Sequence, residues 1–287
     1  MSRKIGDCPY FIALRLKRVL AIFVQDGKLP NMNEREFIMY GKMIVLATLF
    51  IAAGSYSQPA REQADGNFAA GLGVGVGNSV YKGDDTRVIA VPLIRYNYGD
   101  FYISGKSLGY NIIADEAFEF GVIGQWRTDG YDDDDSHYLK GMEDRNMSFD
   151  GGLSTSYKDG WGKTTLSYVT DLLSVHDGQE LALSYGKRFS SGNFSVTPSV
   201  GTAYKTSNLT DYYYGVMNKE ALPNRAAYKC GESVDPFVNI NIRYDFNPNW
   251  SALGMLGCEF LGSEITDSPI VDDNYQAMLM AGVMYSF

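Results

Sequence analysis

Segments of about ten residues in which apolar side chains stand at every second position are the feature that most constrains this chain. Four segments show the alternation most clearly: 68–76, 147–157, 194–204 and 238–246. Such alternation is typical of strands with two different faces. Between the apolar positions stand Gly, Ser, Asn, Arg and Asp, which would make a poor dry core but suit a wet lumen. We therefore predict an all-β fold, a closed antiparallel transmembrane β-barrel with its apolar faces toward outer-membrane lipid.

Aromatic residues support this interpretation because they stand at the ends of the apolar faces, as in the girdles of membrane barrels. Examples are Tyr157, Tyr204, Tyr244 and Phe246. The last segment, 275–287, alternates throughout and places Tyr285 and the terminal Phe287 on its apolar face. An amphipathic final strand with a terminal aromatic resembles the signal read by the barrel assembly machinery. We expect Tyr285 and Phe287 to serve as that assembly signal.

Strand number follows from the remaining segments, because single-chain bacterial barrels have an even number of strands. Further candidates are Arg87–Tyr98, Phe101–Ile113, Phe118–Arg127, Lys163–Leu172, Glu180–Phe189 and Ser251–Leu261. With the five segments named above, these make eleven candidates. We expect about 12 strands, with the one still missing between Asn208 and Lys229, and about 10 as the alternative.

The strand count also predicts which compartment each loop enters. If the first strand begins at the periplasmic side, the second strand returns the chain to that side. Asn97–Asp100 is then a tight turn in the periplasm. The same count puts the acidic stretch Thr128–Arg145 in the periplasm, although long loops are usually extracellular. Either this barrel has a long periplasmic loop, or the count is wrong by one strand before residue 128.

An export signal precedes the barrel. Lys42 is followed by the apolar run Met43–Ala53 and then by small residues, which is the order of a secretory signal peptide. The run is too short for a bilayer, which needs about 20 residues. We predict an extension at 1–38 that is disordered or lies upstream of the true start, a signal peptide at 39–57, a linker at 58–65 and the barrel at 66–287.

Composition excludes several function classes. The net charge is −9, and no basic stripe is present to neutralise phosphate, so we expect no nucleic-acid partner. The 3 cysteines are too few for a disulfide scaffold or a Cys-rich zinc site, although a Cys230–Cys258 disulfide remains an alternative. We predict no cofactor and no resident metal.

Three motifs invite a chemical interpretation. His137 stands beside Asp132–Asp135, but the spacing of a calcium loop is absent, so a solvated loop is expected. His176 with Asp177 and a serine of the barrel could imitate a hydrolase triad, without the usual nucleophile motif. The glycines of Gly71–Gly77 lack phosphate-loop spacing and are expected on the small face of a strand.

Several short motifs of the exported part resemble those of the MipA/OmpV family of outer-membrane proteins along nearly its whole length. The residues that carry the resemblance are Tyr81 and Gly83 of YKG, then Tyr213, Tyr214, Gly215 and Val216 of YYGV, Ser268 and Pro269 of SPIV, and the final YSF. Pro92 and Gly178–Gln179 also match.

The resemblance implies a Gram-negative outer-membrane location. One family member is a scaffold that links a lytic transglycosylase to a murein synthase, and others are surface proteins. We therefore expect a non-enzymatic scaffold or surface protein, with murein synthase and lytic transglycosylase as candidate partners. A small-solute channel is the alternative, and a hydrolase using His176 is the third hypothesis.

Overall fold

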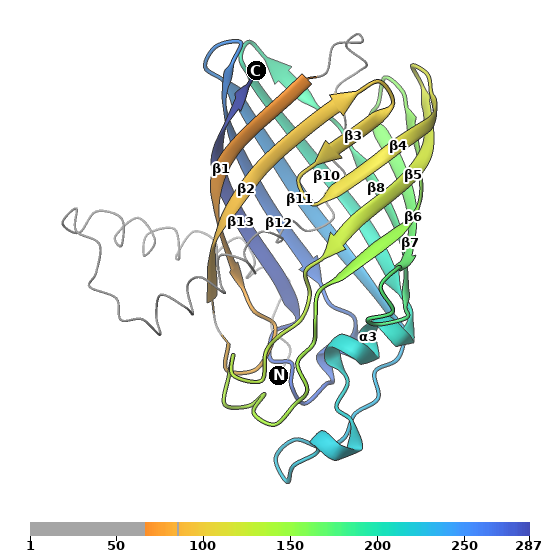
Figure 1. Ribbon diagram of the computed structural model, residues 1–287, viewed down its shortest axis with the longest axis vertical. Coiled ribbons are helices and arrows are strands. Elements are labelled where there is room, and N and C mark those ends of the chain that lie inside the picture. The colour runs from red at the N-terminus through yellow and green to blue at the C-terminus, as the bar shows by residue number, and fades with distance from the viewer. Residues whose placement is uncertain (1–66, 85) are drawn as a thin grey trace, which may run out of the picture.

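One antiparallel sheet wraps into a tilted cylinder in the computed structural model, which describes residues 67–84 and 86–287 (Figure 1). Its strands are β1 (Asn67–Asn78), β2 (Thr86–Tyr98), β3 (Phe101–Ser104), β4 (Ser107–Ala114), β5 (Phe118–Arg127), β6 (Ser148–Lys158), β7 (Lys163–Asp171), β8 (Gln179–Gly186), β9 (Phe189–Ser191), β10 (Phe194–Lys205), β11 (Ser233–Asp245), β12 (Trp250–Phe260) and β13 (Tyr275–Ser286). The predicted extension, signal peptide and linker lie outside the described residues.

The sheet closes because both of its ends find partners. Strand β1 pairs with β2 on one side and with the last strand, β13, on the other, and β10 pairs with β11. Strands β8 and β9 both pair with β10 and are two pieces of one interrupted strand. The prediction of a closed antiparallel barrel with 12 strands is confirmed, with β9 as the extra piece.

The alternation read from the sequence sets which side chains face outward. In β1, Phe68 and Leu72 are exposed on the outer surface, whereas Ala69 and Gly73 are buried inside. The expectation that Gly71–Gly77 belongs to a strand is thus confirmed. Backbone polar groups of a closed barrel pair between strands, which leaves an apolar outer surface compatible with lipid.

The inner lining is drier than the sequence pattern suggests. Beside the glycine face of β1, apolar side chains of β2, β12 and β13 fill the lumen. This cluster consists of Ala69, Val91, Leu93, Met255, Met278, Met280 and Met284. A lining made entirely of wettable residues is therefore wrong for this sector, because glycines on one strand make room for large side chains from its neighbours.

The hairpin β3–β4 replaces the single strand expected at Phe101–Ile113. The chain turns at Gly105, whose φ of 56° lies in the left-handed region that glycine adopts readily. The extra reversal places Thr128–Arg145 at the opposite end from the predicted one, so the strand count was wrong by one before residue 128. Strands β3 and β4 also supply the missing twelfth strand.

No strand forms between Asn208 and Lys229, contrary to the prediction. This part of the chain contains helix α3 (Ser207–Tyr214) and the 3-10 turn η2 (Asn218–Glu220) instead. Leu209 and Tyr213 are four residues apart and share the buried face of α3. A further short helix, α4 (Ser263–Thr266), precedes β13. None of the helices that the structure describes is long and apolar enough to cross a membrane.

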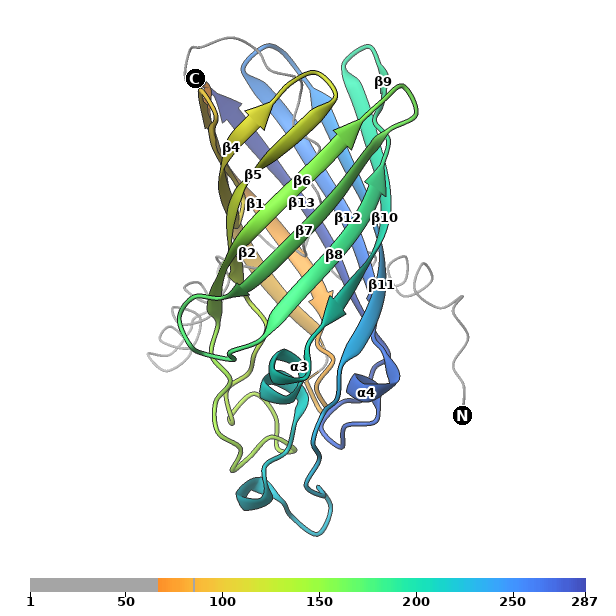
Figure 2. The same cartoon turned by 90° about the vertical axis from the view of Figure 1, so that its right-hand side faces the viewer.

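The two ends of the cylinder differ sharply (Figure 2). Short turns and the C-terminus lie at one end, which also carries exposed aromatic side chains: Phe68, Tyr98, Phe118, Tyr157, Trp161, Phe189, Phe194, Tyr244, Phe246, Trp250 and Phe287. The long segments 128–147, 206–232 and 261–274 lie at the other end, below the strands in Figure 1. Because periplasmic turns are short and extracellular loops are long, the end with the C-terminus is the periplasmic one.

Candidate functional site

The long segments pack together into a loop cap over the extracellular end of the barrel. The cap comprises residues 79–84, 128–147, 206–232 and 261–274, and it has its own buried core. That core consists of Val80, Tyr81, Tyr131, Leu139, Met142, Leu209, Tyr213, Tyr214, Val216, Cys230, Leu261, Ile265, Ile270 and Val271. Packing on this scale fills the mouth of the barrel as a domain core would.

The motif residues singled out in the sequence meet in this cap. The Tyr81 ring stacks on Tyr214 with centroids 5.9 Å apart, and the Tyr81 hydroxyl donates to the carbonyl of Tyr213 at 3.3 Å. The Ser268 hydroxyl donates to the carbonyl of Tyr214 at 2.6 Å, and the Lys82 ammonium donates to the carbonyl of Pro269. Burial raises the pKa of Tyr81 and Tyr214 well above the usual value, so both phenols stay protonated.

Gly83 has a clear structural requirement. Its φ is +78°, and a Cβ at this position would lie 2.9 Å from the Tyr138 ring. Any other residue would therefore be strained and would push against the segment 128–147. A buried ion pair between Arg145 and Glu220, 3.0 Å apart, joins the same segment to η2.

Below the cap, Arg127 at the end of β5 is the centre of a buried network. Its guanidinium contacts Asp150 on β6 at 2.7 Å, Glu180 on β8 at 3.0 Å and Asp129 at 3.2 Å. Bidentate and multiple contacts of this kind suit the planar fork of arginine. Alternation had placed Asp150 on the lumen face, but nothing in the sequence indicated that these side chains converge.

Lys205 is the centre of a second network across the lumen. Its ammonium lies 2.8 Å from Asp235 on β11 and 2.8 Å from Glu259 on β12. The hydroxyl of Ser233 and the N–H of Gly262 also donate to Asp235. Each buried charge thus has partners, as burial requires.

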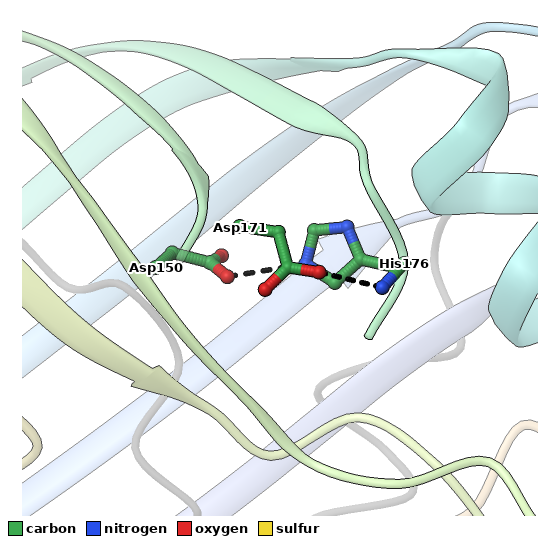
Figure 3. Close-up of side chains that lie close together, drawn as sticks. All are labelled: Asp150, Asp171 and His176. Atoms are coloured by element: carbon green, nitrogen blue, oxygen red, sulfur yellow. Dashed lines mark hydrogen bonds and ion pairs between the residues drawn. The ribbon is translucent and has the colours of Figure 1, made fainter. Parts of the chain in front are cut away.

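His176 is fully buried in the loop between β7 and β8, and its partner is Asp150 (Figure 3). Nδ1 accepts the N–H of Gly178 at 3.0 Å, so the ring proton lies on Nε2 and is donated to Oδ1 of Asp150 at 3.1 Å. Asp171 accepts the backbone N–H groups of Val175, His176 and Asp177. The sequence suggested Asp177 as the partner of His176, but Asp177 is exposed.

The same three side chains could be considered as metal ligands, since one ligand atom from each of Asp150, Asp171 and His176 lies within 4.8 Å of the others. Their lone pairs are already used, however: Asp171 holds the turn, and Nδ1 of His176 accepts a backbone proton. Arg127 also adds a positive charge at 2.7 Å from Asp150. A cation would have to displace all these donors, so the arrangement does not fit a metal centre.

The geometry also differs from a hydrolase triad. In a triad the serine donates to the histidine, which in turn donates to the aspartate. Here the hydroxyl of Ser148 donates to Asp150 itself, 2.8 Å away, and both nitrogens of His176 are occupied. The group is therefore arranged to hold the β7–β8 loop against β6 rather than to activate a nucleophile.

His137 and the acidic run lie on the surface of the cap. His137 is exposed and packs beside the Tyr138 ring, and Asp135 pairs with Arg87 at 2.7 Å. Lys140 contacts Asp133 and Asp134. Asp135 thus pairs with a residue of β2, and Asp133 and Asp134 pair with a lysine of the loop, on a segment that faces solvent.

Cys230 is a free, buried thiol in the cap, so the alternative of a Cys230–Cys258 disulfide is wrong. Its sulfur donates to the carbonyl of Glu264. Burial is the main cause that raises the pKa of this thiol to about 11.

Cavities lie along the cylinder. One of about 110 Å³ is beneath the loop cap, one of about 120 Å³ is at mid-height among serines, and one of about 430 Å³ is at the periplasmic mouth. The last is lined by Arg95, Arg188, Arg243 and Asp245 among others. The widest of the three cavities thus lies at the periplasmic mouth, whereas the loop cap packs over the extracellular end.

Comparisons with known proteins agree with this architecture. Residues 70–287 match the family model described as MltA-interacting protein MipA. The MltA-interacting protein of Escherichia coli K12 is 29% identical over 249 residues, covering 86% of this chain and 98% of the relative. Outer membrane protein OmpV of Vibrio cholerae is 28% identical, covering 78% of this chain and 88% of the relative.

Among solved structures, the COG4313 outer membrane channel of Pseudomonas putida F1 has a TM-score of 0.43 and 10% identity, covering 83% of this chain and 100% of that one. Relatives of this chain are named as outer membrane proteins, and its lipid-facing barrel has the corresponding form. The protein therefore resides in the outer membrane of a Gram-negative cell. With most of its length matched by the family model, this chain belongs to the MipA/OmpV family of outer-membrane β-barrel proteins.

Proposed function

We propose that this chain is a non-enzymatic scaffold that holds a murein-degrading lytic transglycosylase, together with a murein synthase, at the periplasmic end of the barrel. The observation that carries the proposal is the loop cap, whose packed core closes the extracellular mouth. A tube closed at one end is poorly suited to conduct solutes, but it presents a fixed rim to the periplasm. The name of the E. coli relative, MltA-interacting protein, supports a murein enzyme as the partner.

Features of the periplasmic rim suit a protein partner. Trp161, in the turn between β6 and β7, is 77% exposed. Arg188 and Arg243 line the wide mouth cavity nearby. Exposed aromatic residues and arginines are the side chains most enriched in interface hot spots. The acidic segment Thr128–Arg145 lies at the other end, so it is not part of the proposed contact.

A pull-down tests the proposal directly. The mature protein, folded in detergent, should capture purified lytic transglycosylase from the periplasm. Trp161→Ala should weaken capture by about tenfold or more, as for a hot-spot residue. Tyr138→Ala, on the loop cap, is the matched control and should bind as the wild type does. Failure of the folded wild type to capture either murein enzyme would contradict the proposal.

A small-solute channel is the second candidate, favoured by the polar mid-lumen cavity lined by Ser104, Ser154, Ser167 and Ser184. Planar-bilayer recording separates the two functions. A scaffold with an intact loop cap should give no current above the lipid background. Steady single-channel steps from the wild type would favour the channel instead.

A further inference from the structure

The connection between β8 and β9 joins the periplasmic rim to the inside of the barrel. Lys187 lies on its outer side, where the ammonium donates to the carbonyl of Gly160 at 3.3 Å and lies 5.8 Å from the centroid of the Trp161 ring. Arg188, the next residue, points inward, and its guanidinium donates to the hydroxyl of Ser195 on the lumen face of β10 at 3.2 Å. The rim around Trp161 and an arginine of the lumen are thus connected by two consecutive residues.

Arg188 reaches into the mouth cavity, whose volume is about 430 Å³. Ligand pockets usually have volumes of roughly 300–1,000 Å³. Asn67, Asn97 and Pro248 are among the lining residues and lie at strand ends or in a turn, so the cavity extends to the periplasmic edge of the barrel. The lining also offers the hydroxyl and amide groups of Ser104, Ser195, Thr197, Asn241 and Ser286. A pocket of this size and polarity suits a short stretch of polar chain.

The charged side chains that line the mouth cavity are three arginines and one carboxylate. Arg95 enters from β2, Arg188 from the connection between β8 and β9, and Arg243 from β11. Asp245 contacts Arg243 at 2.7 Å. Phe287 also lines the cavity, and its terminal carboxylate adds a second negative charge. With that carboxylate counted, positive charge still exceeds negative charge by one.

Other charges near this end lie outside the mouth cavity. The turns carry the carboxylates of Asp100, Asp115, Glu116 and Asp159 and the ammonium groups of Lys158 and Lys187, and none of these six residues lines the cavity. Asp115 and Asp159 accept backbone N–H groups of their own turns. Deeper in the lumen, Lys163 and Glu119 pair with each other at 2.7 Å. Since salt screens exposed charges over about 8 Å, the groups that line the cavity dominate inside it.

Arg188 keeps an uncompensated positive charge. Its Nε donates to the hydroxyl of Ser190 and its Nη2 to that of Ser195, both at 3.2 Å. Among residues 67–84 and 86–287, no carboxylate lies within 4.0 Å of it. The two hydroxyls orient the guanidinium without neutralising it. Arginine has five N–H donors in a planar fork, so further donors remain for a carboxylate that enters from the periplasm.

We propose that the mouth cavity receives an acidic peptide segment of the murein enzyme held at the rim, and that a carboxylate of this segment binds Arg188. The proposal rests on the scaffold function and adds the chemistry of the contact. The partner covers Trp161 on the outside, and its acidic segment enters beside it. Charge complementarity selects such a segment, and hydrogen bonds between arginine and carboxylate are roughly twice as strong as neutral ones.

Peptide binding to the mature protein in detergent tests the cavity. A blocked peptide of alternating glycine and glutamate should bind about tenfold more tightly than its glutamine and lysine counterparts, and salt should weaken its binding. Arg188→Gln should weaken it by about tenfold or more, and Arg188→Lys by less, because lysine keeps the charge but lacks the fork. Lys158→Gln is the matched control, since it removes the same charge at the same end of the barrel but outside the cavity.

Arg188→Gln leaves no carboxylate without its partner, so the variant should fold as the wild type does, which heat-modifiable migration on a gel verifies. The variant should also weaken capture of the transglycosylase. A photo-crosslinker tests whether the partner enters the barrel. Benzoylphenylalanine in place of Thr197, which lines the cavity, should crosslink to the captured enzyme. In place of Val196, the outward-facing neighbour on β10, it should not.

Three outcomes would overturn the proposal: unchanged capture of the transglycosylase by Arg188→Gln, equal binding of the glutamate and glutamine peptides, or tighter binding of soluble murein fragments than of the glutamate peptide. Tighter peptide binding after deletion of residues 58–65 would assign the cavity to the chain's own linker and would also overturn it. Absence of capture by the wild type would contradict the scaffold function instead, and the peptide measurement would still decide whether the cavity receives an acidic segment.

Discussion

Nε2 of His176 donates a hydrogen bond to Oδ1 of Asp150, 3.1 Å away, and this contact fixes the loop between β7 and β8 to the inner face of β6. The neutral ring is held by a backbone donor on its other nitrogen, the N–H of Gly178. Asp150 in turn holds Arg127, so the contact connects a loop to the buried network of the lumen.

Replacing His176 by alanine removes a donor from a buried carboxylate. We expect His176→Ala to lower the free energy of unfolding in lipid vesicles by about 1–3 kcal/mol, the cost of leaving a buried polar group without its partner. His137→Ala, at an exposed position, should change it by less than about 0.5 kcal/mol. If the two variants unfold at the same urea concentration, the His176 contact contributes nothing to stability. We also expect the esterase activity of His176→Ala to be the same as that of the wild type, at the background of the assay.

Asp129 gives the barrel a defined dependence on pH. Burial raises the pKa of its carboxyl, but the positive charges of Arg127, Lys205 and Lys106 lower it by more, so the pKa lies below its usual value. A group of this kind stabilises the fold above its unfolded pKa of about 3.9 and loses that contribution as pH falls through the folded value. The urea concentration at the midpoint of unfolding should therefore decrease as the pH is lowered below about 4. The decrease should be less steep in Asp129→Asn than in the wild type.

Cys230 should be chemically inert in the folded protein. Its pKa of about 11 means that the thiolate, the reactive form, is scarce at neutral pH. Iodoacetamide at pH 8 should leave Cys230 unmodified in the folded barrel and alkylate it after denaturation, as peptide mass spectrometry would detect. Rapid alkylation of the folded chain would mean that the loop cap opens at this point.

Gly83 and Gly141 form a matched pair for measuring the packing of the loop cap. Both have positive φ, +78° and +80°, but a Cβ would contact Tyr138 only at Gly83. Both alanine variants carry the backbone strain, of about 1 kcal/mol or more, and only Gly83→Ala adds a clash. We expect faster proteolytic cleavage of segment 128–147 in Gly83→Ala than in Gly141→Ala. Equal cleavage of the two variants would show that the contact between a Cβ at position 83 and the Tyr138 ring does not disturb the loop cap.

Topology can be tested in intact cells. A cysteine at Asp134, in the loop cap, should react with a membrane-impermeant maleimide added outside. A cysteine at Gly160, in the turn between β6 and β7, should react only after the outer membrane is permeabilised. The reverse pattern would place the loop cap in the periplasm and with it the acidic segment.

Much of the fold is predictable from the sequence because the strand repeat is local. Each residue of β1 or β13 faces inward or outward according to its neighbours alone. The hairpin β3–β4 was missed because Gly105 interrupts a segment whose side chains otherwise continue the alternation. Helix α3 was missed because a strand was expected between Asn208 and Lys229 to make the strand number even, whereas the helical form depends on Leu209 and Tyr213 packing into the cap.

The candidate site was less predictable because its contacts join residues that are distant in sequence. Arg127, Asp150 and Glu180 come from three strands, and only the closed register brings them together. Alternation places Asp150 inside the barrel without indicating its partner. The sequence offered His176 only as part of a hydrolase triad with the adjacent Asp177, whereas its partner in the fold, Asp150, is distant in sequence.

The shortness of the hairpin β3–β4 has a mechanical consequence. In the periplasmic half of the cylinder every strand apart from the short piece β9 is hydrogen-bonded to both of its neighbours, and this continuous ring of pairs fixes the circumference there. In the extracellular half no backbone pair of the described residues joins β2 to β5, and the ion pair of Arg87 with Asp135 connects β2 only to the segment that follows β5. We therefore expect the extracellular half of the barrel to be less stiff across its width than the periplasmic half, and only weakly dependent on salt, because a partly exposed ion pair contributes little.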